Sequence, residues 1–246
     1  MDIKKISENG NGFLLMVNNS DVSFMNAIRR TAMNTVPVLG VETVQVYENS
    51  SVVPDEMLAH RLGLLAVKTK GALGKSEGVK FSLQKQGPGI VTSGDIECVT
   101  ANAEIAHKNI PILELGKNQS IRLEIEAEMG TGKTHVKWQP GIVSYKQLPK
   151  ISFQNVKDPD AIAKVCPMNV LEVKAKKVFL ADAVNCTVCG ECRDRFPNET
   201  TIEMDDKSFV LLVESNGGVP AGEILEKALL AIKNKNEEFG EAVKAL

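Results

Sequence analysis

The chain has 246 residues, of which 43% are hydrophobic and 24% are charged, and its formal net charge is −2. This composition is typical of a globular protein with a sizeable core and argues against a disordered or membrane-embedded chain. The near-neutral charge provides no strong basic field for nucleic acid. The N-terminal MDIKKISENG is too polar for a signal core, and no run of about 18 apolar residues occurs. We therefore expect a cytoplasmic protein with no strong direct DNA binding and no membrane contact.

The first third of the chain predicts a hairpin, two helices and a strand. Residues 1–19 alternate around the turn Asn9-Gly10-Asn11-Gly12, as in a β-hairpin. Ser20 or Asp21 can cap a helix that ends before Pro37. Its expected inward face consists of Phe24, Ala27, Ile28 and Thr31. A strand is expected over 41–47, and the next helix opens at Pro54-Asp55, turns Leu58 and Leu62 inward and closes at Gly63.

The middle of the chain, from about 64 to 150, predicts a β-rich domain. Short alternating stretches are separated by Gly, Pro and Ser clusters, and they include VKFSLQ, DIECVT, SIRLEIEAE and HVKWQP. The segment AEMGTGKT at 127–134 ends like a nucleotide-binding P-loop, but Ala127 stands at the first required glycine. Such a loop also needs a following helix, whereas THVKWQP favours a strand. We therefore do not expect ATP binding there.

The C-terminal segment predicts a strand, a break and a long amphipathic helix. FVLLVES at 209–215 is strongly apolar, and Asn216-Gly217-Gly218 interrupts it before Pro220 starts the helix. The apolar stripe of this helix comprises Ile224, Leu225, Ala228, Leu229 and Ile232. The stripe must be buried in the chain's own core or against a second chain. Pairing with the N-terminal hairpin and helix would make a discontinuous domain with everything else inserted.

Four of the five cysteines form a metal-ligand pattern. CTVCGEC places Cys186, Cys189 and Cys192 at C-x2-C-x2-C spacing, as in ferredoxins. Cys166, followed by Pro167, resembles the last cysteine of an earlier run and supplies a fourth thiolate. A reducing compartment and an odd cysteine count disfavour a disulfide framework. We therefore expect one iron–sulfur cluster, [4Fe-4S] or, with three ligands only, [3Fe-4S].

A second cluster is not expected, because its four ligand positions cannot bind iron. They are occupied by Val156, Pro159, Ile162 and Phe196. A zinc site with four cysteines and non-ligating thiols are the alternatives for the remaining set. Cys98 has no predicted role. The three histidines are far apart in the sequence, and no catalytic motif is present.

Two segments resemble a known family. FMNAIRRTAMNTVP at 24–37 and VYENSSVVPDEMLAHRLGLLAV at 46–67 are similar to the signature region of the alpha-like assembly subunit of DNA-directed RNA polymerases. With GTGKTHVKWQPG at 130–141, the cysteine segment and the closing strand and helix, the resemblance extends over essentially the whole chain. It is to the archaeal members of that family, which are designated by the letter D.

The resemblance implies an α+β fold in three parts. A split alpha-like dimerisation domain would comprise 1–41 and 208–246. It would hold an inserted β-rich domain, 42–155, and a ferredoxin-like iron–sulfur insert, 156–207, with strands NVLEV at 169–173 and TTIEM at 200–204.

The resemblance also implies a non-catalytic platform subunit of RNA polymerase, a nucleotidyltransferase only as a complex. It would form a heterodimer with subunit L, join small subunits N and P, and support assembly of the large catalytic subunits. Arg29, Arg30, His60 and Arg61 match signature positions, and Arg suits interface carboxylates. Subunit L would then be a second candidate for the surface that buries the apolar stripe of the C-terminal helix. The cluster would support folding or assembly. The alternative from the cysteines alone is a ferredoxin-type electron-transfer or redox-sensing protein.

Overall fold

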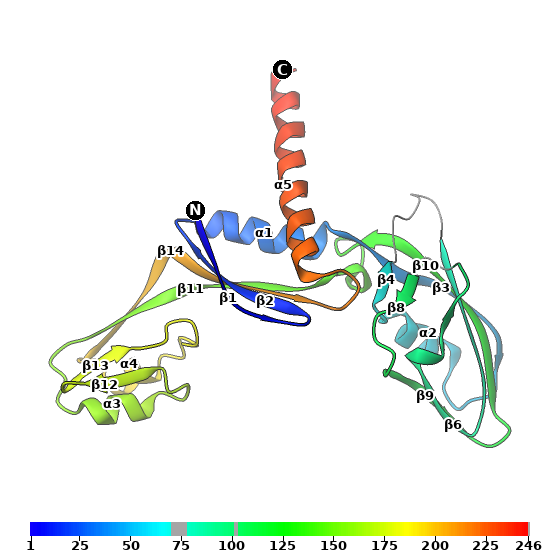
Figure 1. Ribbon diagram of the computed structural model, residues 1–246, viewed down its shortest axis with the longest axis horizontal. Coiled ribbons are helices and arrows are strands. Elements are labelled where there is room, and N and C mark those ends of the chain that lie inside the picture. The colour runs from blue at the N-terminus through cyan, green and yellow to red at the C-terminus, as the bar shows by residue number, and fades with distance from the viewer. Residues whose placement is uncertain (70–77, 101–102, 246) are drawn as a thin grey trace. The chain divides into compact units, whose positions relative to one another are not determined.

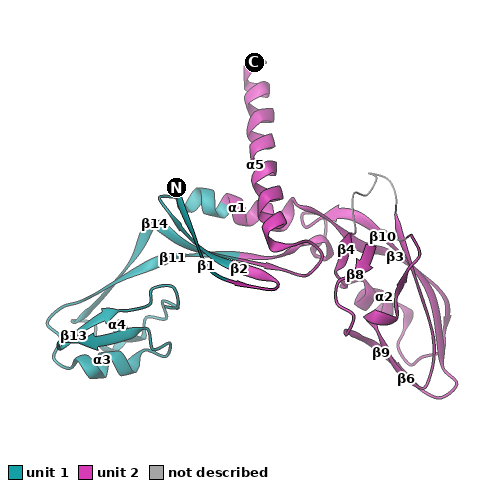
Figure 2. Cartoon of the chain, in the orientation of Figure 1, with its two compact units in different colours: residues 1–7, 14–26, 144–212 teal, residues 8–13, 27–143, 213–246 magenta. Residues whose placement is uncertain are grey.

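The structure is a computed structural model that describes residues 1–69, 78–100 and 103–245. The chain divides into two compact units, each made of segments that are far apart in the sequence (Figures 1 and 2). The first unit contains residues 1–7, 14–26 and 144–212, and the second contains 8–13, 27–143 and 213–246. The fold is therefore discontinuous, and part of the predicted β-rich segment lies outside the described residues.

A four-stranded sheet joins the two ends of the chain. Its strand order is β1-β2-β14-β11, with β1 Asp2–Asn9, β2 Gly12–Asn18, β11 Gly141–Phe153 and β14 Thr200–Ser215. The predicted hairpin and closing strand are confirmed. A Cβ atom on Gly12 would lie 2.3 Å from the carbonyl oxygen of Val213, so only glycine permits this close approach of β2 to β14.

Helix α1, Val22–Asn34, begins at the predicted cap. The Asp21 Oδ1 atom accepts the N–H of Phe24 at 2.9 Å. The buried residues of the helix are Met25, Ile28 and Ala32. Of the expected inward face only Ile28 is buried, and Phe24, Ala27 and Thr31 are half-buried. The prediction was wrong by about one position, because packing against the rest of the chain selects the face.

The second unit contains the β-rich domain. Its main sheet has the order β3-β10-β5-β7, with β3 Pro37–Asn49, β5 Val79–Gln86, β7 Glu97–Cys98 and β10 Ser120–Thr131. Two-stranded sheets pair β4 Val67–Thr69 with β8 Ala103–Ile105 and β6 Gly89–Thr92 with β9 Pro111–Leu115. The short 3-10 helix η1 comprises Ser93–Asp95. Alternation along β10 buries Ile121, Leu123, Ile125 and Ala127. Helix α2, Asp55–Gly63, adds Leu58 and Leu62 to this core, as predicted.

The segment HVKWQP is not a strand, contrary to the prediction. It forms the 3-10 helix η2, Val136–Trp138, because the Nδ1 atom of His135 accepts the N–H of Lys137 at 3.1 Å and caps the turn. The preceding Gly-Lys-Thr loop is not followed by an α-helix. Its Lys133 N–H instead donates to the carbonyl of Asn34 at the end of α1, at 3.0 Å.

The cysteine-bearing segment folds within the first unit. Its elements are α3 Pro159–Val165, β12 Leu171–Lys174, β13 Lys177–Leu180 and α4 Glu191–Arg195. β12 and β13 form an antiparallel pair, and the predicted strand at 169–173 corresponds to β12. The two strands expected at 200–204 and 209–215 are one continuous strand, β14. The long strands β11 and β14 thus continue from this segment into the four-stranded sheet (Figure 1).

Helix α5, Ala221–Lys244, closes the chain after Pro220, as expected. Ile224 and Ala228 are fully buried by their own chain. Leu229 keeps 41% of its surface exposed. No helix among the described residues is long and apolar enough to span a membrane.

Candidate metal centre

The loop 186–190 and helix α4 present three of the cysteines. Val188 and Gly190 adopt left-handed backbone conformations, with φ of 53° and 83°. These turns reverse the chain between successive cysteines, and glycine adopts such a φ without strain. The Gly190 carbonyl then accepts the N–H groups of Arg193 and Asp194, each at 2.9 Å, which starts α4. Cys192 therefore lies on a helix, whereas Cys186 and Cys189 precede it.

Cys166 comes from the end of α3. Its N–H donates to the Ala163 carbonyl at 3.3 Å, and its own carbonyl accepts the N–H of Asn169 at 3.1 Å. The helix must end here because Pro167 follows. The Cys-Pro pair is thus held in a turn beside the three-cysteine loop.

All four predicted ligands line one small cavity. The other side chains in its wall are almost entirely apolar: Ile151, Met168, Val170, Leu171, Thr187, Val188 and Ile202. Cys186 and Cys192 are buried, Cys166 is half-buried and Cys189 is exposed. Burial is the main cause that raises the pKa of the Cys192 thiol, with smaller contributions from Cys189 and Cys186. A bound metal would oppose this effect, because it stabilises thiolates.

In the described wall of this cavity, the four thiols are the only side chains of the His, Cys, Asp or Glu type. Within the described residues, no group of three or more His, Cys, Asp or Glu side chains is arranged to hold one metal ion. A mononuclear zinc site needs four sulfurs about 2.3 Å from one atom. Cysteines that converge on an apolar cavity are a donor set suited to an iron–sulfur cluster.

The residues at the ligand positions of a second cluster contribute to an apolar core instead. Ile162 is completely buried, and Val156 and Phe196 pack against its cluster of side chains. Pro159 starts α3, for which the Asp158 side chain accepts the N–H of Ala161 at 3.1 Å. These four residues therefore stabilise the segment by packing and helix initiation.

Two residues that support the cysteine loop were not found by sequence reasoning. The ammonium of Lys146 on β11 donates to the carbonyls of Val184 and Cys186, and the carboxylate of Asp182 accepts hydrogen bonds from Asn185. Lys146 lies 40 residues before Cys186 and belongs to no motif. No pattern in the sequence could therefore have identified it.

The predicted partner-facing polar residues lie on two helices. Arg29 and Arg30 are on α1, half-buried and exposed respectively, and His60 is exposed on α2. Arg61 is exposed too, but its Nη2 atom donates to the carbonyl of Pro111 at 2.8 Å. Arg61 therefore has a structural role within its own chain.

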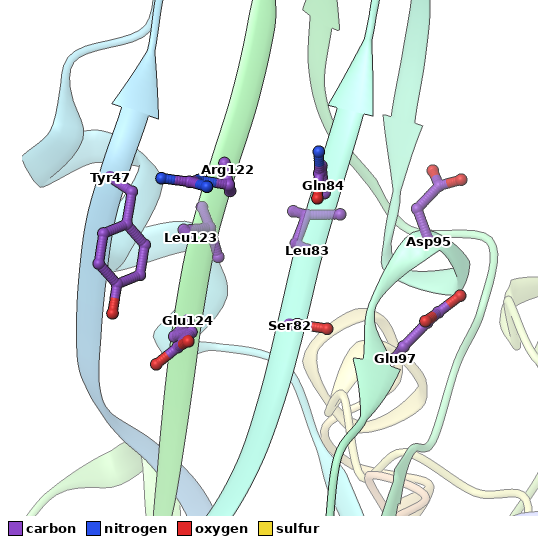
Figure 3. Close-up of a pocket in the computed structure, with 9 residues that line it drawn as sticks. All are labelled: Tyr47, Ser82, Leu83, Gln84, Asp95, Glu97, Arg122, Leu123 and Glu124. Carbon is purple, nitrogen blue, oxygen red and sulfur yellow. The ribbon is translucent and has the colours of Figure 1, made fainter.

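A polar groove of about 370 Å³ on the outer face of the β-rich sheet is a further surface feature (Figure 3). The Arg122 guanidinium lies 5.2 Å from the centre of the Tyr47 ring. Glu124 and Glu97 also line the groove. The sequence gives no motif for it, because outward-facing polar residues are normal on a half-exposed sheet.

Comparisons with known proteins find relatives that match nearly the whole length of the chain. Residues 44–143 match the family described as the RNA polymerase Rpb3/RpoA insert domain. The chain is 33% identical over 257 residues to DNA-directed RNA polymerase subunit Rpo3 of Methanosarcina acetivorans, covering 97% of this chain and 96% of the relative. It is 34% identical to Rpo3 of Halobacterium salinarum, with 98% and 97% covered. Rpo3 of Methanocaldococcus jannaschii is 50% identical over 127 residues, 52% of this chain and 65% of the relative. These relatives carry the designation Rpo3 rather than the letter D.

Proposed function

Because the chain belongs to the family of DNA-directed RNA polymerase Rpo3 subunits, we propose that it is a non-catalytic subunit on which that enzyme is assembled. The observation that carries this proposal is the match over 97% of the chain and 96% of a relative. Chemical catalysis belongs to the complex and not to this chain. The designation by the letter D remains a prediction.

The proposed first partner is subunit L, in a heterodimer that uses the split domain. Exposed apolar side chains on one side of α5 support this assignment, since Leu229 is 41% and Phe239 71% exposed. The half-buried Phe24 and Ala27 of α1 add apolar surface that their own chain covers only in part. Small subunits N and P and the large catalytic subunits would then join the heterodimer, with Arg30 and His60 among the exposed polar residues available to them.

The proposed cofactor is a single [4Fe-4S] cluster held by Cys166, Cys186, Cys189 and Cys192 in a ferredoxin-like insert. The four thiols that line one apolar cavity support it, and so does the filled second site. The cluster would link α3, the loop at 186–190 and α4. Cross-linking these short elements compensates for the small core of the insert, so the cluster would support folding and assembly.

A redox-sensing or ferredoxin-type electron-transfer role is the second candidate. It is favoured by one observation, the exposure of Cys189, which leaves one edge of the site near solvent. Oxidative loss of the cluster would begin at this cysteine and loosen the insert. A change in partner binding after reversible oxidation would support sensing.

The experiment is anaerobic co-purification of the tagged chain from its host, with identification of partners and measurement of iron. RNA polymerase subunits together with about four irons per chain would support both parts of the proposal. Polymerase subunits without iron would reject the cluster only. Iron with electron-transfer enzymes in place of polymerase subunits would reject the assembly role.

A further inference from the structure

The side chain of Lys146 connects strand β11 to the loop that carries Cys186. Its half-buried ammonium donates to the Val184 carbonyl at 2.5 Å and to the Cys186 carbonyl at 2.9 Å. An ammonium has three donors, and two of them are used on this one loop. Hydrogen bonds from a charged donor in a partly buried place are among the stronger ones in proteins. Lys146 therefore restrains the backbone of a predicted ligand directly.

The loop itself is organised by Asp182. The carboxylate accepts the backbone N–H of Asn185 at 3.0 Å and its side-chain amide at 2.6 Å. These hydrogen bonds are the main cause that holds the pKa of Asp182 below its usual value, and the charge of Lys146 contributes. The turn at 182–185 is therefore a preformed unit, and Lys146 attaches that unit to β11.

Lys146 and its neighbour Lys150 on strand β11 differ in their contacts and exposure. Lys150 lies on the same strand and forms an ion pair with Asp205 at 3.1 Å, but 65% of its side chain is exposed. Ion pairs of this kind contribute little. Because β11 also belongs to the four-stranded sheet with the N-terminal hairpin, the contacts of Lys146 extend from that sheet to the cysteine loop.

We propose that Lys146 is the positioning residue of the cluster site, which fixes the Cys186 loop to β11 and places a positive charge against the backbone carbonyl of that ligand. This inference rests on the proposed cluster. Four thiolates around iron carry net negative charge, so a nearby ammonium stabilises the more reduced, more negative state. Lys146 thereby slows loss of the cluster, raises its reduction potential and connects its occupancy to the sheet of the split domain.

The test compares Lys146→Met, Lys146→Arg and the matched control Lys150→Met in the full chain, each co-expressed with subunit L and loaded with iron anaerobically. Lys146→Met is expected to release iron to a chelator about tenfold faster, since residues that support metal ligands typically have effects of this size. Its reduction potential should move to a more negative value. Lys146→Arg retains the charge and should restore most of the potential, and Lys150→Met should match the wild type.

A measurement without iron separates the mechanical role from the electrostatic one. In the iron-free chain, hydrogen exchange of the amides at 182–190 should become faster in Lys146→Met but not in Lys150→Met. Release rate, potential and exchange that all equal those of Lys150→Met would overturn the inference while leaving the cluster intact. A wild-type chain that binds no iron would overturn the proposed cluster and this inference together.

Discussion

Trp138, the only tryptophan of the chain, lies across two glycines. A Cβ atom would come within 2.9 Å of its ring at Gly40 on β3 and within 2.3 Å at Gly130 on β10. The indole N–H donates to the Glu128 carbonyl at 3.1 Å, and the Lys137 ammonium lies 4.4 Å from the ring centre. Gly130, in the Gly-Thr-Gly-Lys segment, and Gly40 thus have a packing role, because the flat ring needs a surface without side chains.

Replacing Gly130 with Ala should therefore destabilise the second unit. The added methyl group meets the indole ring itself, and overpacking of this kind costs about 1–3 kcal/mol. Urea unfolding followed by Trp138 fluorescence measures the free energy of unfolding. Gly222→Ala is the control, since nothing lies within 4 Å of its Cβ, and it should be neutral or slightly stabilising. Equal stability of the two variants would contradict the packing role.

Asp95 stabilises the β-rich domain in a pH-dependent way. Its carboxylate accepts hydrogen bonds from Lys85 Nζ and from the Thr92 N–H, both at 2.7 Å, and these hold its pKa below the usual value, the Lys85 bond being the larger cause. A lowered pKa means that the stabilisation is complete above the ordinary pKa of aspartate and is lost as pH falls through the lowered value.

Asp95→Asn should thus cost about 1.5–3 kcal/mol of unfolding free energy at pH 7, the range for hydrogen bonds to charged groups. The difference from the wild type should shrink as the solution is acidified, because protonation removes the same charge from Asp95. Glu97→Gln, on the neighbouring strand and exposed, should have little effect. A difference that stays constant down to acid pH would contradict the ionic origin.

The second half of helix α5 is covered little by its own chain. The residues from Lys233 to Lys244 are exposed, apart from half-buried Gly240. Phe239 is 71% and Val243 50% exposed, and they continue the apolar stripe of Leu225, Leu229 and Ile232 at steps of three and four with one polar position, Asn236. A helical segment of about 12 residues is marginal alone in water, so a partner that covers the stripe would stabilise this half.

Leu229→Glu and Phe239→Glu should each weaken the heterodimer with subunit L by at least about tenfold. Each would place a charge on the apolar stripe, and a buried unpaired charge costs more than about 1.4 kcal/mol, the equivalent of that factor. Titration of the purified chain with subunit L measures the Kd. Asn234→Glu falls on the opposite side of the helix and serves as the control. Unchanged affinity in Leu229→Glu would remove α5 from the interface, and an effect of Leu229→Glu alone would limit the interface to its first half.

In the whole molecule, the cysteine segment lies between two strands of the four-stranded sheet. The chain passes from β11 into the segment and from the segment into β14, and these two strands are neighbours in the sheet. The segment therefore does not interrupt the strand order. Its own core of Ile162, Leu171, Val178 and Cys192 is small. Loss of the cluster should therefore affect this segment more than the rest of the chain.

Cys189→Ser should abolish the brown absorbance of the loaded chain and expose residues 156–207 to protease, while pairing with subunit L persists. The serine is a poor iron ligand, and the four-stranded sheet does not require this side chain. Absorbance, limited proteolysis and pairing are measured on one preparation, and Cys98→Ser, on β7 in the other unit, is the control. Simultaneous loss of pairing would contradict an insert that folds separately.

Much of the architecture could be predicted because it depends on local patterns. Turn residues at 9–12 define the hairpin, Pro54 and Gly63 bound α2, and alternation marks β10. The inward face of α1 and the 3-10 helix at Val136–Trp138 could not be predicted. Both depend on partners distant in the sequence, which decide between local conformations of similar energy.

The four cysteines and the apolar residues at the second ligand set could be recognised without a structure, because cluster ligands follow a spacing that a single loop must satisfy. The folded chain alone shows that these thiols line one apolar cavity and that Lys146, 40 residues before Cys186, holds the Cys186 loop. It also shows which side of α5 is buried. Spacing constrains a loop, whereas burial and long-range hydrogen bonds exist only after distant segments have packed together.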